Sequence, residues 1–357
     1  MPVTAASAFS ASNSNLAKTI CIACVLFANF LALLSASTRE VGNWARQSPI
    51  VSPAMRINPG LAYDLVRQKL VMFGGFGIPD FQNARVCCFG DTWSWNGQNW
   101  TQEFPAGSQP TPRTSPAIAY DSARNEMVMF GGQSPNGNLT DTWVYNGTIW
   151  IQRIPAMTPP VGSWAMAYDS ARQEAVMFGV GSGSSQTWIW NGLNWIQRFP
   201  TNSPPIKYAH AMSYDPIRGE TVVFGGFIDG DIIQMANDTW VWNGINWAQR
   251  FPNTSPSRRA HYGMSYSPQG ILLFGGSEQF GDGGSAFNRN DTWIWTGTNW
   301  VLQQPAVKPP TTADDTLAFD PIRQEVVLAA KGEFFVDNVA QTWVWKLRKL
   351  SGQTTSP

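Results

Sequence analysis

Few side chains of this 357-residue chain are suited to acid–base chemistry, and those few lie at related positions. His210 and His261 are the only histidines, and Tyr262 follows the second. These residues, Trp164 and the pair Asp314–Asp315 all stand four or five residues before a recurring Tyr or Phe. An imidazole exchanges protons near neutral pH, an indole stacks on ring-shaped ligands, and a carboxylate accepts hydrogen bonds. We therefore expect these residues to line a site for a sugar or a small anion.

Four cations precede the same recurring aromatic residue by seven positions, namely Arg56, Arg113, Lys207 and Arg259. Guanidinium and ammonium groups bind carboxylates and phosphates, so these residues would suit an anionic ligand. We include Arg113, Lys207 and Arg259 among the candidate ligand-binding residues. The alternative is that the residues at these positions make local hydrogen bonds that hold the backbone.

The recurring aromatic residue belongs to a sequence unit that occurs six times. A complete unit has Tyr-Asp or a variant, an apolar run that usually ends in two glycines, a D-T-W-x-W segment or a variant, and a segment that begins with Trp and usually ends in Pro. The first Trp of D-T-W-x-W falls at Trp93, Trp143, Trp188, Trp240, Trp293 and Trp343. Seventeen of the 18 tryptophans occupy repeated positions, and Trp164 is the exception. We expect the seventeen to pack between units and Trp164 to have another role.

Each unit contains four short stretches that favour strands, with an Asn-Gly hairpin signal between the third and fourth. This pattern predicts an all-β fold, a six-bladed β-propeller of four-stranded antiparallel blades. The sixth unit lacks its fourth stretch, whereas residues 41–49 match that stretch and have no unit of their own. We expect this N-terminal strand to complete the last blade and close the ring, which removes the exposed sheet edges.

The Tyr, the apolar run with its glycine pair and the Trp of D-T-W-x-W together resemble the kelch repeats of the galactose oxidase central domain. The resemblance covers residues 43–346. Gly179-Val180 and Ala329-Ala330 replace the glycine pair in two units, so we expect those turns to differ in shape.

The resemblance implies two enzymatic precedents on a propeller of this kind. One is a sugar epimerase that is exported and six-bladed, for which His210, Asp315 and Arg259 would be acid–base candidates. The other, less favoured, is a copper radical oxidase, which needs two histidines, tyrosines and a Cys–Tyr cross-link. His210, His261, Tyr262 and one of the adjacent Cys87 and Cys88 supply these residue types in minimal number.

Composition excludes several classes of partner. Charged residues make up 13% of the chain and the formal net charge is zero, which argues against a nucleic-acid binder. The sequence has no G-x-S-x-G, H-E-x-x-H or phosphate-loop motif. We expect no cofactor and no metal, and we leave open whether Cys87 and Cys88 form a disulfide.

The N-terminus has the pattern of a secretory signal. Lys18 precedes an uncharged apolar run over 19–34, and small residues follow at 35–37. We assign 1–37 to a signal peptide, 38–349 to the propeller and 350–357 to a tail. The alternative is an uncleaved membrane anchor over 19–36, which would place the protein at a membrane.

We expect a secreted monomer, extracellular or periplasmic, that binds a carbohydrate or a protein ligand at one mouth of the channel. The alternative is an exported enzyme on the same fold, epimerase-like or, less favoured, copper oxidase-like.

The signal pattern predicts that the mature protein begins near Thr38, because cleavage after Ser37 places small residues at the last and third-from-last positions of the signal. Intact-mass measurement of the exported protein checks this expectation. A mass that still includes residues 1–37 would favour the anchor instead.

Overall fold

The computed structural model describes residues 40–77, 88–228, 234–279, 286–311, 313–314, 316–330 and 340–349. Gly42–Lys346 form one compact unit, and this account concerns that unit. The predicted signal, Cys87, Asp315 and the tail 350–357 lie outside the described residues. No helix within the described ranges is long and apolar enough to cross a membrane.

Within the described residues, six sheets share the order of four antiparallel strands that the sequence predicts. The first strands are β3 (Gly60–Asp64), β8 (Ala117–Asp121), β14 (Gly162–Asp169), β19 (Ala211–Asp215), β24 (Gly263–Ser267) and β30 (Thr316–Asp320). The second strands are β4 (Lys69–Phe73), β9 (Glu126–Phe130), β15 (Glu174–Gly181), β20 (Glu220–Ile228), β25 (Gly270–Phe274) and β31 (Glu325–Ala330). The third strands are β6 (Thr92–Trp95), β12 (Thr142–Tyr145), β16 (Ser184–Trp190), β21 (Gln234–Trp242), β28 (Thr292–Trp295) and β32 (Gln341–Lys349). The fourth strands are β7 (Trp100–Glu103), β13 (Trp150–Arg153), β17 (Trp195–Arg198), β22 (Trp247–Arg250), β29 (Trp300–Gln303) and β1 (Glu40–Arg46).

Short strands extend the sheets at the ends where the first strands begin. They are β2 (Arg56–Ile57), β5 (Phe76–Gly77), β10 (Gln133–Ser134), β11 (Gly137–Asn138), β18 (Lys207–Tyr208), β23 (Arg259–Ala260), β26 (Ser277–Gln279) and β27 (Ala286–Asn288).

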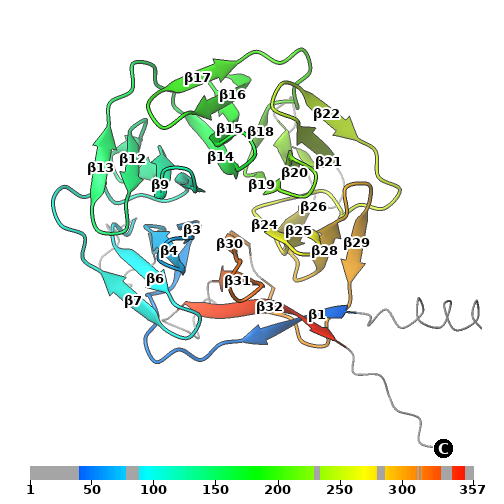
Figure 1. Ribbon diagram of the computed structural model, residues 1–357. Coiled ribbons are helices and arrows are strands. Elements are labelled where there is room, and N and C mark those ends of the chain that lie inside the picture. The colour runs from blue at the N-terminus through cyan, green and yellow to red at the C-terminus, as the bar shows by residue number, and fades with distance from the viewer. Residues whose placement is uncertain are drawn as a thin grey trace, which may run out of the picture. The chain divides into compact units, whose positions relative to one another are not determined.

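The six sheets stand in a ring, with their first strands nearest the central axis and their fourth strands outermost (Figure 1). This arrangement is a β-propeller, and the all-β prediction is confirmed. In the sixth sheet the order is β1-β32-β31-β30, so the N-terminal strand supplies the outer position. The prediction that residues 41–49 complete the last blade is therefore confirmed, with the strand itself at Glu40–Arg46.

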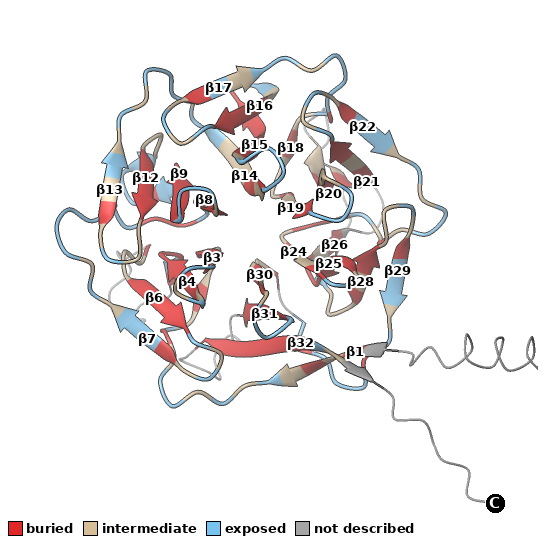
Figure 2. Ribbon diagram, viewed as in Figure 1, coloured by how far each residue is buried: buried red, intermediate tan, exposed pale blue. Residues whose placement is uncertain are grey.

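Apolar residues are buried between neighbouring blades (Figure 2), because both faces of each inner strand meet another sheet. Each of the six apolar clusters draws its residues from two adjacent blades. The second-strand Phe that precedes the glycine pair, or the residues that replace this pair, packs its ring against the fourth-strand Trp of the next blade. The pairs, with centroid distances of 4.9–5.3 Å, are Phe73–Trp150, Phe130–Trp195, Phe178–Trp247, Phe224–Trp300 and Phe274–Trp44.

The same fourth-strand tryptophans join the blades through a complete cycle of hydrogen bonds. Each indole Nε1 donates to the buried Thr of D-T-W, or of Q-T-W, in the preceding blade, at 2.8–3.0 Å. The pairs are Trp100–Thr342, Trp150–Thr92, Trp195–Thr142, Trp247–Thr187, Trp300–Thr239 and Trp44–Thr292. The expectation that repeated tryptophans pack between units is met, with a polar contact added at each seam.

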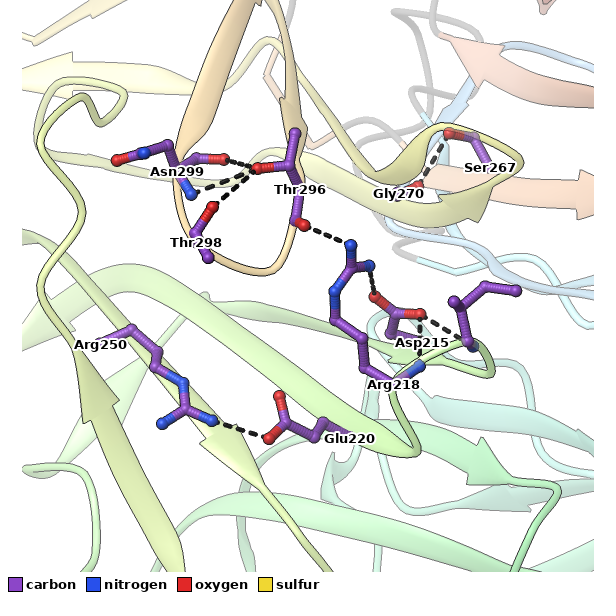
Figure 3. Close-up of polar contacts among 10 residues, drawn as sticks. Asp215, Arg218, Glu220, Arg250, Ser267, Gly270, Thr296, Thr298 and Asn299 are labelled. Carbon is purple, nitrogen blue, oxygen red and sulfur yellow. Dashed lines mark hydrogen bonds and ion pairs between the residues drawn. The ribbon is translucent and has the colours of Figure 1, made fainter.

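The turns between the third and fourth strands, which are Asn-Gly or Thr-Gly, are also tied to the neighbouring blade. Arg218 binds Asp215 of its own turn at 2.6 Å and donates to the carbonyl of Thr296 in the next blade (Figure 3). A Cβ on Gly297, whose φ is 93°, would collide with the Arg218 guanidinium, so only glycine fits there. The equivalent pairs are Arg67–Gly147, Arg124–Gly192, Arg172–Gly244 and Arg323–Gly97.

Truncating Trp44 should open the ring at its closing strand. Trp44 is 1% exposed, contacts Phe274 and Trp345, and bonds Thr292, so Trp44→Ala should cost roughly 3–5 kcal/mol of unfolding free energy. Denaturant unfolding measures the loss, with Ile50→Ala as the control because Ile50 is 91% exposed. Equal stability of the two variants would contradict closure by β1.

Candidate functional site

Glycine pairs shape the mouth of the channel. In four blades the Phe of the second strand is followed by two glycines with positive φ, at Gly74–Gly75, Gly131–Gly132, Gly225–Gly226 and Gly275–Gly276. A Cβ on Gly132 would lie 2.7 Å from the carbonyl oxygen of Thr114, so the glycine permits close approach of the segment that enters the first strand. The pair thus sets where each entry segment runs.

Buried cations brace the same entry segments. Arg113 is fully buried and binds both carboxylate oxygens of Asp141, at 2.6 and 2.8 Å, as well as the carbonyl oxygen of Gly131 at 2.9 Å. Trp143 Nε1 also donates to Asp141. Burial alone would raise the pKa of Asp141, but the hydrogen bonds and charge of Arg113 outweigh it and hold that pKa below its usual value. The equivalent ion pairs are Arg56–Asp91, Lys207–Asp238 and Arg259–Asp291.

Two blades lack both the cation and the carboxylate. Gln186 and Gln341 replace the Asp of D-T-W there, and each side-chain oxygen accepts from the following Trp, at 2.8 and 3.1 Å. The cation position holds Val161 in one of these units and Thr312 in the other. A neutral amide therefore stands where no cation is available, since an unpaired buried carboxylate would be costly.

Arg113, Lys207 and Arg259 consequently support the backbone behind the mouth. None of the three is among the residues that line the central cavity within the described chain. For these cations the structure favours the local hydrogen-bonding alternative over direct contact with an anionic ligand.

A cavity of about 780 Å³ lies at the channel mouth and is lined by residues from all six blades. Among the sequence candidates it brings together Trp164, His210, His261, Tyr262 and Asp314. Asp315 lies outside the described residues.

Tyr262 has a structural role at the edge of this cavity. Its hydroxyl donates to the carbonyl of Phe224 and accepts from the amide of Ala211 at 3.3 Å. Only 4% of the residue is exposed, and burial raises the pKa of its hydroxyl. The neighbouring blade therefore satisfies the hydroxyl both as a donor and as an acceptor.

Three polar side chains form an arc on the first, fifth and sixth blades. Asp314 Oδ1 accepts from Asn58 Nδ2 at 3.0 Å and contacts His261 Nδ1 at 2.6 Å. The His261 side chain is 36% exposed and faces the edge of Phe227 at 5.5 Å between ring centroids. An imidazole held in this way by a carboxylate has a fixed orientation, and its other nitrogen is the one directed away from the pair.

Trp164 faces this arc from the third blade. Its strand β14 lies across the axis from β30 of the sixth blade (Figure 1). The indole rests on Gly181 and Gly162, where a Cβ would lie 2.6 and 2.8 Å from the ring, and Nε1 donates to the carbonyl oxygen of Pro160 at 3.2 Å. The glycines and this hydrogen bond fix the ring at the cavity wall.

Sequence reasoning missed Asn58 and did not foresee that Asp314 joins it to His261. All three stand five residues before the recurring aromatic residue. They have φ values of 49°, 60° and 65°, and Asn, Asp and His are the non-glycine residues that tolerate this region best. This shared position in the repeat was the sequence signal that could have identified the three residues as one group.

The oxidase interpretation receives no support from the candidate copper ligands. His210 Nε2 lies 3.2 Å from the carbonyl oxygen of Phe178, His261 is bound to Asp314, and Tyr262 to Phe224. Cys88 takes part in a disulfide, and its partner lies outside the described residues. In the described part of the chain, no group of three or more His, Cys, Asp or Glu is placed to hold a metal ion.

Comparison with known proteins supports the fold. No protein-family model matches the sequence, and no curated protein sequence is a significant match. Among solved structures, that of a protein named YjhT matches with a TM-score of 0.61 over 84% of this chain and 99% of its own. At 12% identity this similarity establishes the β-propeller fold alone.

His210 should make the protein less stable in acid. Burial, and secondarily the charge of Lys207, lowers the pKa of His210 from 6.5 to about 4. Between these values the unfolded chain binds a proton that the folded chain does not, so stability falls as pH drops from 6.5 towards 4, by about 3 kcal/mol in total. His210→Gln should remove this component, as unfolding titrations across that range would show. An unchanged pH slope would mean that His210 is not held neutral.

Proposed function

We propose that this protein is a binding module for a carbohydrate and that the ligand sits at the channel mouth. The observation that carries the proposal is the indole of Trp164, fixed on two glycines, across the cavity from the polar arc of Asn58, His261 and Asp314. A sugar ring has an apolar face of C–H groups and a rim of hydroxyls. The first suits an aromatic platform and the second suits carboxylate, amide and imidazole groups.

The proposal extends to the family and the location. The glycine pairs, the inter-blade tryptophans and the ring closure by an N-terminal strand support a place among kelch-type propellers. The signal pattern over 1–37 supports export, and a disulfide at Cys88 is of the kind that persists in oxidising compartments. A protein ligand in place of a free sugar would use the same mouth.

A second candidate is an exported enzyme that acts on a sugar. The observation in its favour is the 2.6 Å contact between His261 and Asp314, because a carboxylate partner orients an imidazole for proton transfer. Conversion of a bound sugar, followed by NMR, separates this candidate from a binding module.

Trp164→Ala should weaken carbohydrate binding and leave the fold largely intact. Loss of a stacked aromatic is worth about 1–3 kcal/mol of binding free energy, roughly a 5- to 150-fold loss of affinity. The probes are methyl β-D-glucopyranoside, methyl β-D-galactopyranoside and methyl α-D-mannopyranoside, titrated calorimetrically.

Trp143→Ala is the matched control. Trp143 is 6% exposed in a cluster between the first two blades, so its truncation should cost roughly 3–5 kcal/mol of stability. The proposal is wrong if none of the three glycosides binds the wild type, or if Trp164→Ala destabilises the protein as much as Trp143→Ala and leaves affinity unchanged.

A further inference from the structure

Five of the six blades place a residue with positive φ at the entry to the first strand. These residues are Asn58, Ser115, Ala209, His261 and Asp314, with φ between 49° and 65°. All five line the cavity. Non-glycine residues seldom adopt this conformation, and its recurrence around one cavity gives the five peptide groups a common orientation.

Peptide hydrogen bonds link these residues from blade to blade. The amide of Ser115 donates to the carbonyl of Asn58 at 2.9 Å. The amide of Asn58 donates to the carbonyl of Asp314 at 3.4 Å. The amide of Asp314 donates to the carbonyl of His261 at 2.7 Å, and the amide of His261 donates to the carbonyl of Ala209 at 3.1 Å. Each amide thus points to the preceding blade and each carbonyl to the following one.

The series is broken at the third blade. Its equivalent residue, Ser163, lies within β14 and pairs with Val180 of β15. Val180 stands where four other blades have the second glycine, so the strand pair continues and the entry segment does not turn over the mouth. The Ser163 carbonyl instead lies against Gly179 of its own blade.

Two peptide groups face this break from opposite sides. By the orientation that the five residues share, the Ser115 carbonyl and the Ala209 amide point towards the third blade. Within the described residues, neither group makes a backbone hydrogen bond. The wall between them carries the indole of Trp164.

We propose that a carbohydrate completes the series by lying on Trp164, with one hydroxyl donating to the Ser115 carbonyl and another accepting from the Ala209 amide. This inference rests on the proposed function. It adds which edge of the sugar the protein recognises. A hydroxyl both donates and accepts, so a polyol satisfies both peptide groups at once, whereas an anion would suit only the amide. The ligand class is therefore a neutral sugar ring with hydroxyls along one edge.

Amide hydrogen exchange tests the break and its occupation. In the free protein the Ala209 amide should exchange faster than the amides of Asn58, Ser115, His261 and Asp314, because these four have peptide acceptors. The methyl glycoside that binds most tightly among the three above should slow exchange at Ala209. Protection of Ala209 in the free protein, or no change with bound glycoside, overturns the inference.

A backbone substitution tests the contact itself. Replacing Ala209 by lactic acid through nonsense suppression keeps the side chain and converts the amide to an ester, which deletes the donor. Affinity for the same glycoside should fall about 3- to 10-fold, the scale of one neutral hydrogen bond. The same replacement at Ala123, in the turn between β8 and β9, should leave affinity unchanged.

The two proposals fail in different ways. If Trp164→Ala weakens binding and the ester at Ala209 does not, the sugar sits at the mouth without using this peptide, and only the present inference is overturned. If neither change weakens binding, the site itself is wrong.

Discussion

The hydrogen bond between a fourth-strand indole and the threonine of the preceding blade is the interaction on which the ring depends. A β-sheet satisfies its own backbone, so apolar packing alone would let neighbouring blades slide. The indole Nε1 fixes the register, because a shift of either sheet would leave a buried donor without its acceptor. Trp44 and Thr292 show the principle best, since a strand from the start of the chain is placed by the same contact as the other five.

The geometry of the channel mouth depends on this alignment of neighbouring blades. Glycine pairs bring the entry segments over the mouth, and buried cations such as Arg113 fix them to the same D-T-W segments that carry the threonines. The cavity side chains therefore project from braced backbone. The third blade differs by Val161, Val180 and Gln186 together, so the loss of the brace, the loss of the turn and the presence of Trp164 belong to one local change.

The repeat made most of the fold predictable from sequence, because each position in it has one physical task. The position of each segment within the repeated unit predicted the four strands, the packing role of the tryptophans and the N-terminal closing strand. The site was harder to foresee. Arg113 finds its partner 28 residues away, and His261 finds Asp314 53 residues away in another blade, which no local pattern reveals. The covariation of the cation with Asp or Gln before Thr-Trp was visible in the sequence and would have identified the brace.

The arginine–glycine contacts between neighbouring blades have one gap, between the fifth and sixth blades. The sixth blade has no Asn-Gly turn, because its outer strand comes from the other end of the chain, and the fifth unit has Ser267 and Gly270 where its relatives have Asp and Arg. The fifth and sixth units thus differ from the others at the place where the N-terminal strand closes the ring. A circular permutant with its termini between the third and fourth strands of another blade would leave one arginine without a turn and one new turn without an arginine. The order of the units along the chain is therefore part of what the sequence encodes, although the blades look interchangeable.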